Sequence, residues 1–299
     1  MLTFYDINYE ILSLYKIFLE NEHDLCIRYS IAWGTRKSIS NSRKGTTING
    51  YFKKFKTFIF HYKKLLNESY NPFADFKIDS DIFGKPICLT NDEFYYLLNL
   101  KLENHRLQKI KDIFVLNCLT SFRVSDFFKL SQSDIINNKI EFYPSKTSKF
   151  EIMVEVPLND TATEIISKYK CDSNYIVPRM SLKTYNKGLK ELFEMVGLDR
   201  KVTYINSESK QTEHAPLYEK VSSHLARRTF ISLLVNAGVS DRIICSMTGH
   251  KPHSREISRY YTIDQETQRD ALNSLKSKLD FSDLLNNNGD LFKQLKTVK

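Results

Sequence analysis

One stretch of the sequence, residues 224–261, combines residue types that could act on a phosphodiester. His224 and Arg227 are three positions apart in a segment with helical periodicity, so their side chains should lie on one helix face. Amides at a helix N-terminus favour an anion, and a guanidinium can donate two hydrogen bonds to phosphate oxygens. His250 follows, and Tyr260 and Tyr261 come ten and eleven residues after it. The stretch therefore offers an anion site with a phenol nearby.

Three basic residues upstream could join this set. Arg123 stands at the start of a predicted helix in TSFRVSDFFKL, and Lys146 and Lys149 lie in a predicted hairpin turn. Breaking a phosphodiester requires a nucleophile, positive charge on the non-bridging oxygens and an acid for the leaving oxygen. Two arginines, a lysine, two histidines and a tyrosine can supply these without a metal. Each residue alone is ordinary, but the set predicts phosphoryl transfer.

The elements that must position these residues are mostly helical. Residues 1–85 carry apolar side chains at three- and four-residue intervals, which predicts amphipathic helices. Residues 71–87 contain two prolines and a glycine and are typical of a linker. Thr90 and Glu93 then form the pattern of a helix-capping box. We expect one domain over residues 1–85 and a second over residues 88–299.

The second domain should also contain a small antiparallel β-sheet. Apolar residues alternate with polar ones at Ile140, Phe142, Ile152, Val154 and Val156, with a turn at PSKTSK between the two runs. Helical patterns return at TATEIISKY, SLKTYNKGLKELFEMVG and SSHLARRTFISLLVNAG. Gly238 suits the end of the last of these helices, and Ser240 suits the start of the next. The expected fold is mainly α with a small antiparallel β-sheet.

The distribution of charge favours a polyanionic partner. The chain has 299 residues and a formal net charge of +9. Residues 36–64 include nine Lys or Arg and no Asp or Glu, which is typical of a surface that meets phosphates. The candidate DNA-binding residues in this region are Arg36, Lys37, Arg43, Lys44, Lys53, Lys54 and Lys56.

Several other classes of protein are disfavoured. The five cysteines are scattered and never spaced as CxxC, so neither a disulfide framework nor a zinc site is expected. No run of about 18 apolar residues occurs, and the N-terminus lacks a signal-peptide pattern. We therefore expect a cytoplasmic, nucleoid-associated protein without a membrane partner.

The order and spacing of the motifs resemble those of one family, the tyrosine recombinases or phage-type integrases. The matching pieces are TSFRVSDFFKL, SKTSKFEIMVEVPL, HLARRTF, the dipeptide GH and the tyrosine in RYYTIDQE. The resemblance covers about residues 88–270, and TTINGYFKKFK and NPF extend it loosely into the N-terminal helices. It implies a helical core-binding domain followed by a mixed α/β catalytic domain.

The resemblance also implies a role for each matching residue. Arg123 and Arg227 would clamp the scissile phosphate. His224 would help take the proton from the tyrosine, and His250 would donate a hydrogen bond to the phosphate. Lys146 would protonate the leaving 5′ oxygen. The tyrosine would form a 3′-phosphotyrosyl link that conserves bond energy, so neither metal, ATP nor any other cofactor would be needed.

Two choices within the resemblance rest on position. Tyr260 is favoured over Tyr261 as the nucleophile, because it better fits the family spacing from the histidine and is followed by Ile263 three residues later. Lys146 is favoured over Lys149 because the family uses the first lysine of the turn.

The first arginine box departs from the family pattern T-G-L-R-x-S-E. Ser121, Phe122 and Asp126 stand in place of Gly, Leu and Glu. Asp126 is still an acid that can buttress the arginine.

The resemblance further implies site-specific recombination of double-stranded DNA by a homotetramer on two duplexes, as in the integration of a mobile genetic element. Accessory proteins of the host or of the element would be further partners. Residues 280–299 are expected to form a C-terminal helix, either exchanged between subunits or packed on its own subunit. The alternatives are relaxation of DNA by a type IB topoisomerase mechanism, and a non-catalytic helix-turn-helix protein built on FISLLVNAGVSDRIICSMTG. The second would leave Arg123, Lys146 and the tyrosines unexplained.

Overall fold

The computed structural model describes residues 3–29, 43, 45–65, 69–80, 84–145, 153–170, 174–206, 209, 211–251, 254–260 and 272–273. By its internal contacts the chain divides into two compact units, one of residues 1–87 with 183–222 and one of residues 88–182 with 223–299. The division of the sequence into domains 1–85 and 88–299 stays a prediction, and the expected helix over residues 280–299 lies outside the described residues.

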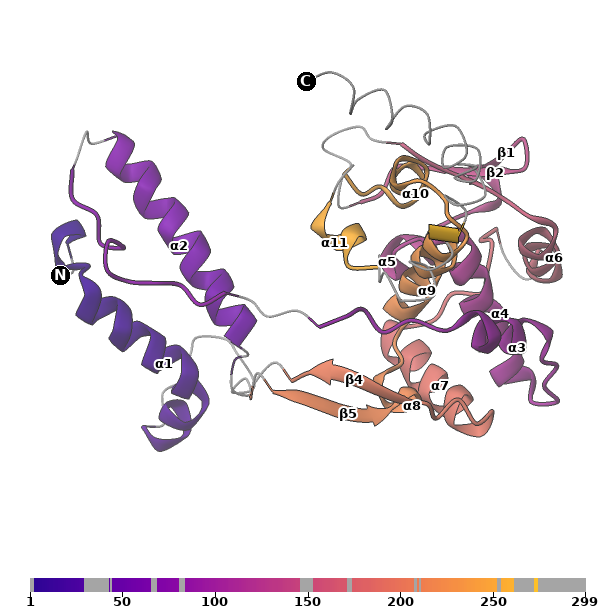
Figure 1. The fold of residues 1–299 in the computed structure, drawn as a ribbon, viewed down its shortest axis with the longest axis horizontal. Coiled ribbons are helices and arrows are strands. Elements are labelled where there is room, and N and C mark those ends of the chain that lie inside the picture. Colours follow the sequence, from indigo (N-terminus) through magenta and orange to yellow (C-terminus); the bar gives the residue numbers. More distant parts are fainter. Residues whose placement is uncertain are drawn as a thin grey trace, which may run out of the picture. The chain divides into compact units, whose positions relative to one another are not determined.

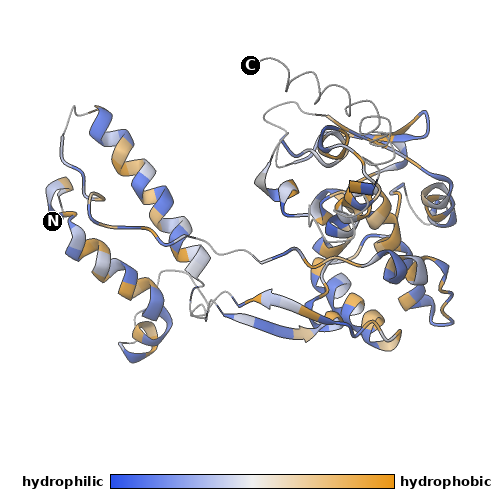
Figure 2. Ribbon diagram, viewed as in Figure 1, coloured by the Kyte–Doolittle hydropathy of each residue, from blue (hydrophilic) through white to orange (hydrophobic). Residues whose placement is uncertain are grey.

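The first unit opens with two long helices (Figure 1). A short 3-10 helix (Phe4–Asp6) leads into α1 (Tyr9–Arg28), which is followed by α2 (Gly45–Leu65). Hydrophobic and hydrophilic segments alternate along α2 in Figure 2, as the pattern of aromatic and lysine residues predicts. The buried core of this region consists of Leu12, Leu19, Ile48, Phe52, Ile59, Phe73 and Phe76. The helical prediction for this part of the chain is confirmed.

The first unit also contains a β-hairpin that the sequence pattern did not predict. Helix α7 (Leu182–Met195), most of which belongs to this unit, precedes β4 (Lys201–Ile205), β5 (Thr212–Pro216) and the short α8 (Leu217–Lys220). The strands are antiparallel, with Lys201 opposite Pro216 at one end. The Tyr204 hydroxyl donates to Glu213 over 2.6 Å, and Lys220 Nζ lies 3.5 Å from the centre of the Tyr204 ring. The second strand, β5, carries too few apolar residues to show an alternating pattern.

The second unit is built around α4 (His105–Thr120), which packs against α6 (Asp160–Tyr169) and α9 (Ser223–Asn236). A buried carboxylate, Asp112, ties α4 to α6: it accepts hydrogen bonds from Lys168 over 2.5 Å and Tyr169 over 2.9 Å. A buried charge is costly unless it is paired in this way. Helix α4 is therefore a fixed base for the residues that follow its C-terminus.

The remaining described elements of the second unit are mostly short helices. They are α3 (Asn91–Asn99), α5 (Val124–Phe127), α10 (Asp241–Thr248) and α11 (Arg255–Ser258), with a short 3-10 helix (Gln132–Asp134) before β1. The capping box at the start of α3 is confirmed: Thr90 N donates to the Glu93 carboxylate over 2.8 Å, and Glu93 N donates back to the Thr90 hydroxyl over 3.2 Å.

A three-stranded antiparallel sheet completes this unit. It has the order β1 (Ile135–Ile136), β2 (Lys139–Phe142), β3 (Val154–Pro157), and Phe142 pairs with Val154 beside the connecting turn. Ile140, Val154 and Val156 are buried, which confirms the predicted alternation at those positions. The mainly α fold with small antiparallel sheets is thus confirmed. Among the described residues, no helix combines the length and the apolar character needed to span a bilayer.

Candidate active site

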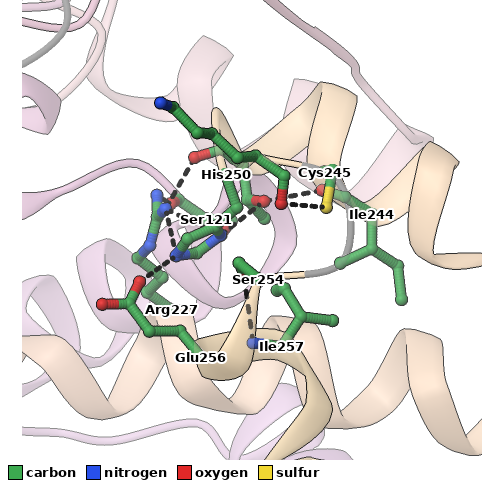
Figure 3. Close-up of polar contacts among 10 residues, drawn as sticks. Ser121, Arg227, Ile244, Cys245, His250, Ser254, Glu256 and Ile257 are labelled. Carbon is green, nitrogen blue, oxygen red and sulfur yellow. Dashed lines mark hydrogen bonds and ion pairs between the residues drawn. The ribbon is translucent and has the colours of Figure 1, made fainter.

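Arg227 is the centre of the candidate site. Its side chain projects from α9, and the residue is 4% exposed. Nη1 donates to the Ser121 carbonyl over 2.7 Å (Figure 3). Nη2 donates to the Thr248 carbonyl over 2.6 Å. These bonds use two of the five N–H groups of Arg227. Both acceptors are backbone carbonyls rather than carboxylates.

Both carbonyls belong to helix C-termini. Ser121 follows the last residue of α4 in the left-handed conformation, with φ 62°, and Thr248 is the last residue of α10. The final carbonyls of a helix lack intrahelical partners and carry the negative end of the helix dipole. A buried cation between two such ends satisfies both, which explains why the guanidinium is tolerated there.

Gly249 and His250 follow directly after α10. Gly249 has φ 65°, and a Cβ on it would lie 3.1 Å from a Val154 methyl group of β3. Glycine therefore permits both the turn and the close approach of the hairpin. His250 Nδ1 lies 2.8 Å from the Thr248 hydroxyl, and Arg227 Nη2 lies 3.3 Å from the same ring nitrogen. His250 is thus held against Arg227.

His224 begins the same helix face one turn before Arg227. Burial lowers the pKa of its imidazole to about 4, and the charges of Arg228, Arg227 and Arg123 act in the same direction. The residue as a whole is exposed, but the charges of the three arginines lower the pKa of the imidazole independently of burial. His224 is therefore neutral near pH 7 and able to accept a proton.

Tyr260 lies just beyond α11, and its backbone N–H donates to the Ile257 carbonyl over 2.9 Å. It packs against the buried cluster of Phe230, Ile231, Ile244, Cys245 and Ile257. Burial raises the pKa of the phenol to about 12, although Arg228, Arg227 and Arg259 each lower it. The phenol is therefore protonated at neutral pH and needs a base to become a strong nucleophile.

Arg123 occupies the residue before α5, two positions after Ser121. Its charge lowers the pKa of both His224 and Arg227, so it acts on the same region. Within the described part of the chain, no hydrogen bond or ion pair engages its guanidinium. The left-handed turn at Ser121 thus brings one helix end to Arg227 and starts the segment that carries Arg123.

Asp126 connects this segment to the β2–β3 hairpin. The residue is buried, and its Oδ1 accepts a hydrogen bond from Ser145 N over 3.4 Å. Lys129 Nζ also contacts the Ser145 hydroxyl at 3.3 Å. The strand that leads into the predicted catalytic turn is therefore anchored beside the first arginine segment. Lys146 and Lys149 lie outside the described residues.

Taken together, the structure brings five of the predicted residues into one unit around Arg227. Four segments supply them: the start of α5, helix α9, the residue after Gly249 and the residue after Arg259. The five are Arg123, His224, Arg227, His250 and Tyr260. Arginines surround a neutral histidine and a neutral phenol, an arrangement suited to a phosphate anion. Tyr261 lies outside the described residues.

The predicted DNA-binding residues on the first unit have different environments. Lys53 and Lys54 are exposed on α2, and Lys56 Nζ lies 5.7 Å from the centre of the Phe73 ring. Arg43 forms an ion pair with Glu22, which raises the pKa of its guanidinium, and donates to the Tyr51 hydroxyl over 2.8 Å. Arg36, Lys37 and Lys44 lie outside the described residues.

Sequence reasoning missed two polar residues of this site. Thr248 contributes both its carbonyl and its hydroxyl, and Glu256 Oε2 lies 3.5 Å from His250 Nε2. A signal for Glu256 was available, because it precedes Tyr260 by four residues in a helical segment. The role of Thr248 depends on a contact with Arg227, 21 residues away, which no local pattern encodes.

Comparisons with known proteins identify the family and the fold of the chain. The sequence model of the phage integrase family matches residues 88–267. The chain is similar to the integrase of the transposon Tn1549 bound to circular intermediate DNA, with 17% identity, a TM-score of 0.58, and coverage of 89% of this chain and 86% of that chain.

Two further structures of Tn1549 integrase variants are similar to this chain. One, also with circular intermediate DNA, has 15% identity, a TM-score of 0.59 and coverage of 87% and 85% of the two chains. The other, with transposon right end DNA, has 17% identity, a TM-score of 0.57 and the same coverage. No curated protein matches the sequence. At these identities the structural likeness establishes a shared fold.

Proposed function

The chain belongs to the phage integrase family and is a site-specific DNA recombinase, and we propose that it cuts DNA with Tyr260 as the nucleophile. The observation that carries this proposal is the buried Arg227, fixed by two helix C-termini beside His250, with His224 on the same helix and Tyr260 acted on by its charge. Such a constellation binds an anion and presents a phenol to it.

The proposed reaction begins with a phosphodiester bound by Arg123 and Arg227. The remaining N–H groups of Arg227 and the guanidinium of Arg123 meet the non-bridging oxygens, whose negative charge grows as phosphorus becomes pentacoordinate. His250 adds a hydrogen bond from its position against Arg227. Because the arginine charges are fixed before the substrate arrives, little reorganisation is needed in the transition state.

The chemical step moves one proton to His224 and another to the leaving group. Neutral His224 accepts the proton of the Tyr260 hydroxyl, and the tyrosine oxygen forms a bond to phosphorus as the bond to the 5′ oxygen breaks. We propose that Lys146 protonates that 5′ oxygen; the anchoring of Ser145, its chain neighbour, by Asp126 supports this. The 3′-phosphotyrosyl link is resealed when a 5′ hydroxyl attacks it, so no ATP is needed.

We further propose the assembly in which this reaction occurs. Exchange between two duplexes requires four strand cleavages, so one tyrosine per protomer implies a homotetramer on double-stranded DNA. Residues 1–85 would form the core-type DNA-binding domain, with exposed Lys53 and Lys54 facing phosphates, and residues 88–299 the catalytic domain. Exchange of a helix over residues 280–299, accessory proteins and association with the nucleoid belong to the same proposal.

Trapping of the covalent intermediate tests the nucleophile. The substrates are duplexes with randomised sequence around a nick. After cleavage the short strand beside the nick dissociates, so the DNA cannot be resealed and the protein stays linked to it. Complexes that resist detergent are recovered, and the attached DNA is sequenced to give the cleavage site. We expect Tyr260→Phe to abolish the complex and Tyr261→Phe, the matched control, to retain it. The reverse result would identify Tyr261 as the nucleophile. If both variants retained the covalent complex, the mechanism would be overturned.

A modified substrate tests the acid. Sulfur in place of the bridging 5′ oxygen leaves without a proton, so it should restore cleavage to a variant that lacks the acid. We expect the sulfur substrate to restore cleavage by Lys146→Ala. Lys149→Ala should cleave the ordinary substrate and not require the sulfur. Joining of two differently labelled duplexes then separates recombination from topoisomerase-type relaxation of one duplex.

A further inference from the structure

An acidic side chain reaches into this cationic site from the helix that precedes Tyr260. Glu256 lies on α11, and its Oε2 is 3.5 Å from His250 Nε2 (Figure 3). The Glu256 side chain is 74% exposed, whereas that of His250 is 12% exposed. A solvated carboxylate has many conformations available, so its placement against a nearly buried ring indicates attraction by the local positive charge.

The field of Glu256 extends past the histidine. Its charge raises the pKa of Arg227, which shows that the carboxylate acts on the same guanidinium that the proposed mechanism uses for phosphate. The other carboxylate acting on Arg227, that of Asp126, is buried and bonded to Ser145 N. Glu256 thus differs from Asp126 in being an anion that can leave the site by rotating into solvent.

We propose that Glu256 is an internal substitute for the scissile phosphate, holding the anion position beside His250 and Arg227 until DNA displaces it. The proposal rests on the function inferred above for this site. A phosphodiester accepts from the same ring nitrogen, so phosphate and carboxylate cannot both hold it. Because Glu256 and Tyr260 are four residues apart, arrival of the phosphate releases a contact on the segment that carries the nucleophile.

The contact has a simple energetic consequence. An exposed ion pair changes an equilibrium by a factor of about five. Removal of the carboxylate should therefore improve phosphate binding by about five-fold, because the anion no longer has to displace it. Glu164 offers a matched control, since it is an exposed glutamate on α6 of the same unit, and Glu164→Gln makes the same change in net charge.

Binding of inorganic phosphate tests the proposal without knowledge of the DNA site. The imidazole signals of His250 are followed by NMR as phosphate is added, with assignment from His250→Gln. We expect half-saturation at about five-fold lower phosphate in Glu256→Gln than in the unmodified chain, and no change in Glu164→Gln. Equal or weaker binding in Glu256→Gln would overturn the proposal, as would an equal gain in Glu164→Gln.

A second measurement locates the competition at one phosphate of DNA. Variants are made in the Tyr260→Phe background, and binding is measured to the duplex recovered by covalent trapping. The gain from Glu256→Gln should disappear when a neutral methylphosphonate replaces the scissile phosphate, and a gain that persists would refute the idea. Failure of the proposed function is seen separately, as absence of covalent trapping by the unmodified chain.

Discussion

Ser121 stands where the family has glycine, and its geometry predicts that glycine would be better for stability. The residue is fully buried and has φ 62°, a conformation that disfavours any side chain with a Cβ. Its hydroxyl lacks a hydrogen-bond partner within the described part of the chain. Its backbone, in contrast, is fully used: the amide donates to the Asn117 carbonyl over 2.8 Å, and the carbonyl accepts from Arg227.

The expected magnitude follows from four effects. Relief of the left-handed strain contributes about 1–2 kcal/mol, and removal of a buried unbonded hydroxyl contributes about 1–3 kcal/mol. The greater freedom of glycine in the unfolded chain costs about 0.5–1 kcal/mol, and the lost packing of two atoms costs about 1 kcal/mol. Ser121→Gly should therefore stabilise the second unit by about 1–2 kcal/mol, with the carbonyl that holds Arg227 unchanged.

Hydrogen exchange of the α4 and α9 amides measures this unit separately from the first. A gain of about 1–2 kcal/mol slows exchange through global opening by about 5- to 30-fold. Ser121→Ala is the control, because it removes the hydroxyl but keeps the strained backbone. Faster exchange in Ser121→Gly would refute the reasoning. Faster exchange in Ser121→Ala as well would show that the hydroxyl has a partner.

The remaining predictions concern the charged groups of the site. Arg227→Lys should lose cleavage and also destabilise the second unit by about 1–3 kcal/mol, because one ammonium group cannot satisfy both carbonyls. Arg123→Lys should lose cleavage but change the free energy of unfolding by no more than about 0.5 kcal/mol. Urea titration of the two variants compares their free energies of unfolding. The cleavage rate, measured with DNA at a limiting concentration, should not fall between about pH 8 and 6 through protonation of His224. The pKa of His224 is lowered to about 4, so its proton-accepting form persists over this range. The same shift lowers stability as pH falls from about 6.5 toward 4, since the unfolded chain binds the proton first. A limb near pH 6.5 that disappears in His224→Gln would contradict the lowered pKa.

The sequence predicted the elements whose signals are local. Periodicity marked α1 and α2, alternation marked β2 and β3, and Thr90 with Glu93 marked the start of α3. The hairpin β4–β5 was missed because its stability depends on pairs across the strands, such as Tyr204 with Glu213, rather than on apolar alternation. The glycine turn after α9 was easier to predict than the left-handed serine after α4, because a serine rarely adopts that conformation.

The candidate site shows the same division. The residue types and their order predicted the set around Arg227, but not the contacts that fix it. Arg227 binds the carbonyls of Ser121, 106 residues before it, and Thr248, 21 residues after it. Backbone carbonyls exist at every position, so nothing in the sequence distinguishes these two. Only the packing of α4, α9 and α10 selects them.

The choice of carbonyl acceptors for Arg227 has a functional consequence. A buried carboxylate would fix the guanidinium equally well, but it would cancel the charge that a phosphate needs. Helix C-terminal carbonyls orient the group with partial charges and leave the site cationic. Burial and Arg123 lower the pKa of Arg227 only to about 10, so it remains charged at neutral pH. Asp126 and Glu256 both act on Arg227, but neither accepts from it in the bonds above, and Glu256 is exposed and can leave, so the site keeps its charge for the anion that replaces it.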